Sequence, residues 1–235
     1  MVSAGNQAVL GQEDFLDIFV DDPAVRAIGL HIEGLQDIPS FERAALKALA
    51  KGVPVVALKT GSSTIGSELT VSHTGSLSGS AELYEALFAR VGIISVTNPS
   101  QFLETLKFLC VVGAPKGKKL VGFTCSGGGA TMLADHAEKT GLSFLPVDST
   151  RESELAVLLP AIATVSNPLD YTTPIWGQPK LTYPMFSKAI TVTEADTAVL
   201  VQDYPAVGLD ASKVFYERDA AAFAQAAKEQ GLPAV

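Results

Sequence analysis

The sequence has little of several features that mark specialised classes of protein. It contains only two cysteines, Cys110 and Cys125, too few for a disulfide framework or a metal cage, so we predict a reducing compartment and no metal site. No basic run occurs and the formal net charge is −8, which argues against general nucleic-acid binding. No apolar run is long enough to span a membrane and no basic-then-apolar leader is present. We therefore expect a soluble, cytoplasmic protein that binds neither nucleic acid nor membranes.

Short apolar runs alternate with helical patterns along the first half of the chain. The 235 residues, 47% of them hydrophobic, suffice for one or two domains with sizeable cores. The patterns predict strands at 27–34, 54–59 and 92–96, and helices at 41–50, 81–91 and 99–112. Strands that alternate with helices in this way indicate βαβ units and a parallel sheet.

A lysine-rich linker at 113–119 precedes a second series of elements. The series comprises strands at 120–126, 143–147 and 197–202, and helices at 127–142, 149–160, 184–191 and 212–231. Ser149 and Glu152 have the spacing of a capping box, and Pro184 marks an expected helix start. A last apolar stretch at 232–235 has the pattern of another strand, so we expect the chain to be a fragment of a longer polypeptide.

His73 lies in an unusual setting, the stretch TVSHTGSLSGS at 70–80. Its neighbours are mostly small hydroxyl residues and glycines, which is not the pattern around a core histidine. One interpretation is an ordinary loop histidine that bonds a neighbour. The other is a nucleophile or phosphate carrier, because neutral imidazole attacks phosphorus and small neighbours leave room for a phosphoryl group.

Glu33 lies near the carboxyl end of the first predicted strand, where open α/β sheets place their sites. His31 shares its face of the strand at a period of two. Glu33 is either a solvated carboxylate at the strand exit or the group that orients His73. In the second case it accepts one ring N–H, which fixes the tautomer and leaves the other nitrogen free to attack.

The stretch CSGGGA at 125–130 joins a predicted strand to a predicted helix. Glycines there let backbone amides point outward, and a helix N-terminus adds a partial positive charge, so the turn is a candidate anion site. The glycines also fit an ordinary strand–helix turn. Cys125 raises a further possibility, a nucleophilic thiol at a helix N-terminus, although the sequence offers it no evident base.

Four stretches together resemble one family, the NDP-forming acyl-CoA synthetases related to succinyl-CoA synthetase. The histidine loop KTGSSTIGSELTVSHTGSLSGS at 59–80 is similar to the family's phosphohistidine segment. The stretch 2–34 resembles its Ser-x-Gly-Asn start, Asp-Asp-Pro turn and Tyr-x-Glu-Gly strand end. The stretch 123–142 resembles its glycine-rich turn and helix, and NPLD at 167–170 matches a further motif.

The resemblance implies a reaction and the residues that perform it. Acyl-CoA and phosphate interconvert with an acyl phosphate and CoA, and a phosphohistidine carries the phosphoryl group to ADP. By resemblance His73 is phosphorylated and Glu33 supports it. The phosphohistidine is held by two helix N-termini, one of which consists here of Ser126, Gly127, Gly128 and Gly129. ATP or ADP, Mg and CoA are expected in the complete enzyme, with no cofactor bound by this fragment.

The resemblance also implies an α/β fold of two flavodoxin-like, three-layer domains with mainly parallel sheets. The first, at 1–114, carries the histidine loop and is N-terminally truncated. The second, at 115–235, is either whole or truncated at its C-terminus. CoA-binding and ATP-grasp domains are expected in the same chain or in a partner subunit, and an oligomer is possible. The isolated fragment is therefore expected to be inactive.

Three departures from the family pattern leave the acyl substrate open. Ser62 stands where the family usually has Arg, His31 stands where it has Tyr, and CSGGGA replaces a more usual Asn-Ala-Gly-Gly-Pro-Gly. A relative acting on another acid, such as an aromatic one, is one alternative. Others are a non-catalytic CoA-sensing or scaffold module that keeps the fold, and a thiol enzyme that uses Cys125.

Overall fold

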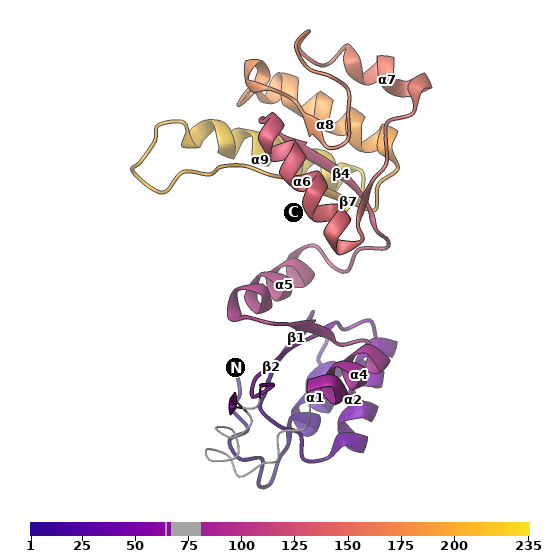
Figure 1. Cartoon of the computed structure of the whole chain (residues 1–235), viewed down its shortest axis with the longest axis vertical. Coiled ribbons are helices and arrows are strands. Elements are labelled where there is room, and N and C mark those ends of the chain that lie inside the picture. Colours follow the sequence, from indigo (N-terminus) through magenta and orange to yellow (C-terminus); the bar gives the residue numbers. More distant parts are fainter. Residues whose placement is uncertain (64, 67–80) are drawn as a thin grey trace. The chain divides into compact units, whose positions relative to one another are not determined.

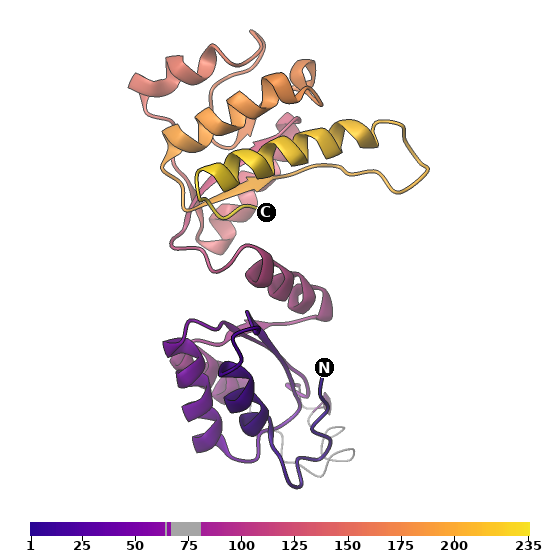
Figure 2. The same ribbon diagram turned by 180° about the vertical axis from the view of Figure 1, so that it is seen from behind.

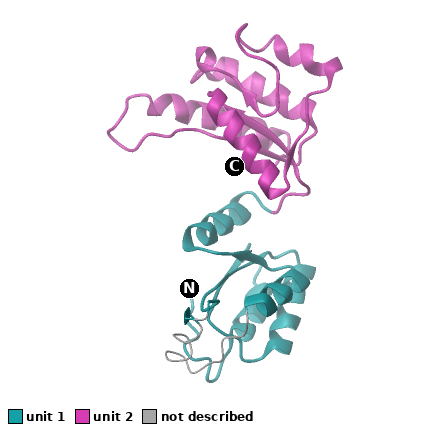
Figure 3. Ribbon diagram, in the orientation of Figure 1, with its two compact units in different colours: residues 1–113 teal, residues 114–235 magenta. Residues whose placement is uncertain are grey.

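The computed structural model describes residues 1–63, 65–66 and 81–235. They form two compact units, Met1–Gly113 and Ala114–Val235, coloured separately in Figure 3. The elements of the first unit are α1 (Gln12–Val20), β1 (Ile28–Ile32), α2 (Ile38–Ala50), β2 (Val55–Lys59), α4 (Ala81–Val91), β3 (Ile94–Val96) and α5 (Pro99–Val111).

The first unit is built on a parallel sheet with the strand order β1-β2-β3. Ile28 pairs with Val55, and Val56 pairs with Ile94. Strand β2 is buried on both faces, as expected for a central parallel strand. Val55 and Ala57 join the core formed with α1, α2 and α4, whereas the alternating Val56 and Leu58 join the smaller core with α5. Figure 1 labels these helices around the sheet. The result is a three-layer α/β arrangement.

Gly29 allows α5 to approach β1 closely. A Cβ atom at this position would lie 2.6 Å from side-chain carbons of both Phe102 and Leu106. Real side chains almost never make contacts this short, so a larger residue would force the side chains of Phe102 and Leu106 to shift. The glycine is therefore part of the packing between these two elements.

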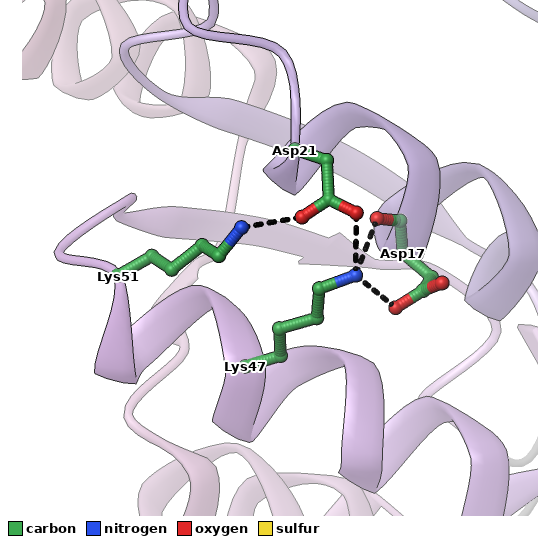
Figure 4. Close-up of polar contacts among 4 residues, drawn as sticks. All are labelled: Asp17, Asp21, Lys47 and Lys51. Atoms are coloured by element: carbon green, nitrogen blue, oxygen red, sulfur yellow. Dashed lines mark hydrogen bonds and ion pairs between the residues drawn. The ribbon is translucent and has the colours of Figure 1, made fainter.

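Helices α1 and α2 are joined by a small network of ion pairs on the surface (Figure 4). Lys47 on α2 lies 2.7 Å from Asp17 and 2.9 Å from Asp21 of α1. Lys51 also pairs with Asp21. Both lysine contacts lower the pKa of Asp21. Because these side chains are exposed to water and salt, the network orients the two helices but contributes little to stability.

The second unit contains a second set of parallel strands and helices. Its elements are β4 (Lys119–Thr124), α6 (Gly127–Thr140), β5 (Ser143–Phe144), α7 (Ser149–Ala156), β6 (Leu169–Asp170), the 3-10 turn η1 (Thr173–Ile175), α8 (Pro179–Thr193), β7 (Thr197–Leu200) and α9 (Lys213–Glu229). Strand β4 is central: it pairs in parallel with β5, β6 and β7.

Helices α8 and α9 lie side by side on one face of this sheet (Figure 2). Their core is rich in aromatic rings, with Phe186 packed edge-on against Phe123 at a centroid distance of 5.0 Å and against Tyr171 at 5.4 Å. Leu133 of α6 lies beside Gly122 of β4, which points to the opposite face. The second unit is therefore also layered helix, sheet, helix.

Asp219 is a fully buried carboxylate in the core of the second unit, on α9. It accepts hydrogen bonds from Tyr171 Oη at 2.9 Å, Gly177 N at 3.1 Å and Thr182 Oγ1 at 3.1 Å. Burial raises the pKa of Asp219, and the three donors oppose that shift. The network ties α9 to the segment after β6 and to α8.

Asp219→Ala should destabilise the second unit by about 2–5 kcal/mol, because three buried donors lose their acceptor. Asp219→Asn should cost less, since the amide oxygen still accepts from Gly177 and Thr182.

The stability of the second unit should also depend on pH through Asp219. The folded state holds the Asp219 proton to higher pH than the unfolded chain does. The stability of the wild type should therefore fall as the pH rises above 3.8, the ordinary value, through the raised pKa. Urea unfolding at several pH values measures this; an Asn variant with an unchanged pH slope would contradict it.

One predicted helix cap and one predicted helix start are wrong, although α7 does begin at Ser149 as predicted. Helix α7 is capped by Asp148, whose carboxylate accepts from Thr150 N, and not by the predicted Ser149. Helix α8 begins at Pro179, whereas Pro184, the predicted start, lies inside it. The described part of the chain contains no helix long and apolar enough to cross a membrane.

Candidate functional site

Glu33 lies at the carboxyl edge of the first sheet, directly after β1. Ile32 pairs with Lys59, the last residue of β2, so Glu33 and Lys59 leave the sheet side by side. The Glu33 side chain is partly buried, and its carboxylate accepts no hydrogen bond from any of the described residues. It also borders a groove of about 740 Å³, formed by residues 1–7, α1 and β1. The carboxylate is therefore placed as an accessible acceptor.

Lys59 and Tyr84 meet at the same edge. Lys59 Nζ donates to Glu33 O at 3.0 Å and to Thr60 O, and it lies 4.7 Å from the centre of the Tyr84 ring. Tyr84, on α4, is buried and its hydroxyl accepts from Leu35 N at 3.1 Å. Burial lowers the pKa of Lys59, and the charge of Glu33 opposes that shift.

The predicted nucleophile, His73, lies outside the described residues. The other two histidines are described and lie elsewhere. His31, on β1, bonds Thr60 Oγ1 through Nε2 at 3.1 Å. His136 is exposed within α6. His31 therefore borders the Glu33 edge, whereas His136 belongs to the second unit.

The glycine turn at 126–129 opens helix α6 at the carboxyl edge of the second sheet. Ser126 is the N-cap, with Oγ accepting from Gly129 N at 3.4 Å. An α-helix leaves its first N–H groups without partners, and within the described chain nothing accepts from Gly127 N or Gly128 N. Both glycines are exposed. The turn therefore offers two open backbone donors at the positive end of a helix dipole.

The three glycines have different physical reasons to be glycine. A Cβ at Gly129 would lie 2.7 Å from Thr124 Oγ1, so packing excludes a side chain there. At Gly127 and Gly128 the nearest atoms would be 3.5 and 3.7 Å away. Gly128 is helical and has no positive φ that would call for glycine. Neither packing nor backbone conformation therefore explains why positions 127 and 128 are glycine, although each glycine lowers helix stability relative to alanine.

A carboxylate stands beside this turn. Asp170 Oδ2 lies 3.5 Å from the Cβ position of Gly127, and Oδ1 accepts from Thr172 N at 2.9 Å. Thr172 has a φ of 63°, a conformation that β-branched residues rarely adopt and that concentrates at functional sites. The negative charge of Asp170 competes with any anion at the turn, so binding of free phosphate there should be weak.

Phosphate added to this chain should shift the NMR signals of amides 126–131. Gly128→Val should reduce the shifts, because a branched side chain covers the open amides while the helix stays formed. Asp170→Asn should enlarge them by removing the competing charge. Shifts confined to the lysine-rich linker at 113–119 would contradict a phosphate role for the turn.

Cys125 is poorly suited to act as a nucleophile. The thiol is partly buried, and burial raises its pKa, as do the nearby carboxylates of Asp219 and Asp170. The reactive thiolate is therefore disfavoured. Among the described residues, no group of three His, Cys, Asp or Glu side chains is arranged to hold a metal ion.

Sequence reasoning missed Lys59, Tyr84 and Thr172 as parts of the two sheet edges. Lys59 was recognisable as a charge that ends an otherwise apolar strand run. Tyr84 and Thr172 carry no such signal, because their significance depends on the contact with Lys59 and on a backbone angle.

Comparison with known proteins identifies the family of the first unit. Residues 1–109 match the family described as the succinyl-CoA ligase like flavodoxin domain. This match lies within the first unit, and it confirms the resemblance seen in the sequence and the expected α/β fold with parallel sheets.

The similar curated proteins are CoA ligases. The alpha subunit of the ADP-forming acetate–CoA ligase II of Pyrococcus furiosus is 36% identical over 169 residues, which is 72% of this chain and 36% of that protein. The ADP-forming acetate–CoA ligase of Methanocaldococcus jannaschii is 32% identical over 72% of this chain and 24% of its own length. A trans-feruloyl-CoA synthase from an unknown prokaryotic organism is 29% identical over 84% of this chain and 27% of that protein. The chain thus spans only about a quarter to a third of these relatives.

A solved structure shares the fold of the whole chain. The dinucleotide forming acetyl-coenzyme A synthetase 1 of Ca. Korarchaeum cryptofilum, in complex with phosphate and ADP, aligns with a TM-score of 0.76 at 24% identity. The alignment covers 100% of this chain and 55% of that one. At this identity the likeness establishes the fold.

Proposed function

We propose that this chain is the phosphohistidine-bearing part of an NDP-forming acyl-CoA synthetase. In the complete protein, acyl-CoA, ADP and phosphate interconvert with a carboxylic acid, ATP and CoA. The observation that carries the proposal is the 36% identity over 169 residues with an ADP-forming ligase subunit. The position of Glu33 at a parallel sheet edge, with an accessible carboxylate, supports it.

His73 accepts the phosphoryl group in this proposal. A neutral ring nitrogen attacks the phosphorus of an acyl phosphate, an N–P bond forms, and the bond to the acyl oxygen breaks to release the carboxylate. Glu33 accepts the N–H of the other ring nitrogen, which fixes the tautomer and stabilises the positive charge that develops on the ring. The phosphoryl group then passes to the terminal oxygen of ADP, which returns the imidazole to its neutral form.

The turn at Ser126, Gly127, Gly128 and Gly129 holds the phosphoryl group in the same proposal. Its two open amides and the dipole of α6 suit a dianionic phosphate. Gly127 and Gly128 fit this role because no packing constraint explains their lack of side chains. In this role the two glycines lower helix stability but leave the backbone amides open to the phosphate.

The remaining parts of the cycle belong to domains outside this chain. CoA, ATP or ADP and Mg are proposed to bind CoA-binding and ATP-grasp domains, in the same polypeptide or in a partner subunit. Among the described residues no cluster suits a metal ion, and the steps assigned to this chain are performed by side chains and backbone amides. Both cysteines are free, in keeping with a reaction in the reducing cytoplasm.

A test of the overall reaction uses the complete protein supplied with acetyl-CoA, ADP, phosphate and Mg. We expect ATP and free thiol to form in equal amounts, and neither to form when phosphate is omitted. Thiol release that does not depend on ADP and phosphate would indicate a thioesterase and contradict the proposal. Feruloyl-CoA and 4-hydroxybutyryl-CoA, tested in parallel, identify the acyl class.

A further inference from the structure

Lys59 and Tyr84 hold the two ends of one short turn, Glu33–Leu35. Lys59 Nζ donates to the main-chain oxygen of Glu33, at the start of the turn. Tyr84 Oη accepts from the main-chain N–H of Leu35, at its end. The ammonium also rests on the Tyr84 ring, so the two holding groups fix each other. We call this arrangement of Lys59, Tyr84 and the turn the Glu33 clamp.

The clamp restrains the Glu33 backbone more than a strand end alone would. Two hydrogen bonds and a cation–π contact come from β2 and α4, which are separate from β1 in the sequence. Lys59 is partly buried and Tyr84 is 7% exposed. A cation–π contact strengthens when water is excluded, and Tyr84 is fixed further by packing on Phe88 at a centroid distance of 5.8 Å. The position from which the Glu33 carboxylate leaves the sheet is therefore set by this pair.

We propose that Lys59 and Tyr84 are positioning residues for phosphoryl transfer, acting through Glu33. The inference rests on the proposed function, in which Glu33 orients His73. A carboxylate that must accept an imidazole N–H has to be placed within a fraction of an ångström, and a misplacement of about 1 Å costs about 100-fold in rate. The clamp supplies that placement, and the side chain of Lys59 needs no contact with the reacting phosphate.

The test measures the rate of phosphoenzyme formation from ATP in single turnovers of the complete enzyme. Lys59→Met keeps the length of the side chain but removes its charge and donors. We expect the rate constant to fall about 10- to 100-fold, with the ATP concentration for half-maximal rate changed by less than about threefold. Lys59→Arg should recover most of the rate, because a guanidinium can bond carbonyl oxygens and stack on tyrosine. Lys47→Met, an equal charge change in the surface network, should leave the rate unaltered.

A double-mutant cycle separates positioning from other roles. If Lys59 acts through Glu33, adding Lys59→Met to Glu33→Gln should slow phosphorylation by less than about threefold beyond Glu33→Gln alone. Full, multiplicative losses would overturn the inference, since they would mean that Lys59 acts on the phosphate or on the fold directly.

A variant of Tyr84 tests the other end of the clamp. Tyr84→Phe, which removes only the bond to Leu35 N, should remain folded and should slow phosphorylation less than Lys59→Met does.

The outcomes distinguish this inference from the proposed function. A wild-type protein that forms no phosphoenzyme contradicts the function itself. A phosphorylated wild type with Lys59→Met equally fast contradicts the clamp alone. A third outcome would also overturn the inference. If Lys59→Met lowers the thermal unfolding temperature, and Lys59→Arg is neither more stable nor faster in phosphorylation than Lys59→Met, the role of Lys59 is purely structural.

Discussion

His73→Ala in the complete enzyme should abolish both phosphoenzyme formation and turnover. The proposed reaction passes the phosphoryl group through an N–P bond, and alanine offers no nitrogen to form it. The expected result is no acid-labile, base-stable phosphate on the chain after incubation with labelled ATP and magnesium. CoA ligation should fall to the background rate, because the terminal phosphoryl group of ATP then has no route to the carboxylate that must become the acyl phosphate.

The other two histidines provide matched controls for this result. His31 bonds Thr60 at the end of β1, and His136 is exposed in the middle of α6. Each is fixed on a regular element, which is a poor place for a group that must exchange phosphate between two reactions. His31→Ala and His136→Ala should therefore still form phosphoenzyme. Loss of phosphoenzyme in the His136 variant, with the His73 variant unaffected, would refute the assignment.

Glu33→Gln should slow phosphorylation by roughly 10- to 10,000-fold, where losing acid–base support altogether typically costs about 100- to 10,000-fold. Glutamine keeps the size of the side chain but carries no negative charge to stabilise a protonated ring. The folded state should change little, because Glu33 lies at a strand exit, outside the core clusters of the described chain. Rapid-quench measurement of phosphoenzyme, together with thermal unfolding, separates the two effects.

Glu42 supplies a control for this change of charge. It lies on α2 in the same unit and pairs with Arg90 at 2.7 Å on the surface. Glu42→Gln should leave the phosphorylation rate within about twofold of the wild type, as expected for a surface ion pair that the proposed reaction does not use. If Glu33→Gln proves as harmless as Glu42→Gln, Glu33 is only a solvated carboxylate at the end of a strand.

The sequence predicts the layered fold well where periodicity and chemistry agree. The run Val55–Leu58 has the continuously apolar composition of a buried parallel strand, and together with Lys59 it forms β2. The helices at 81–91 and 99–112 have helical spacing and appear as α4 and α5 with nearly the same bounds. Parallel order then places Glu33 at a carboxyl edge, which is why this position could be predicted without coordinates.

Helix boundaries depend on competing local signals, and there sequence reasoning fails. Pro184 is a plausible first residue because proline suits the first turn of a helix. Pro179 takes that role, and packing of Met185 and Phe186 in the core keeps the helix intact through Pro184. Helix α1 was not predicted, although Leu16 and Val20, four residues apart, form its buried face.

In the candidate site, the contacts that could not be predicted join segments that are distant in the sequence. Glu33 and the glycine turn are recognisable from local patterns, as a charge at a strand exit and as glycines at a helix start. The Glu33 clamp cannot be recognised from local patterns, since Lys59 and Tyr84 meet only because β2 and α4 fold against the same turn. Asp170 likewise reaches the glycine turn through the pairing of β6 with β4. Contacts between distant segments require the register of the sheet, which composition does not encode.

The most direct measurement is the location of phosphate on the wild-type protein. The complete enzyme is treated with labelled ATP and magnesium, digested at alkaline pH, and its phosphopeptides are sequenced by mass spectrometry. The account predicts one labelled peptide, covering residues 60–80, with phosphate on His73 that disappears when ADP is added. Phosphate on a serine or threonine of the same peptide, or on a peptide from the second unit, would contradict the central claim.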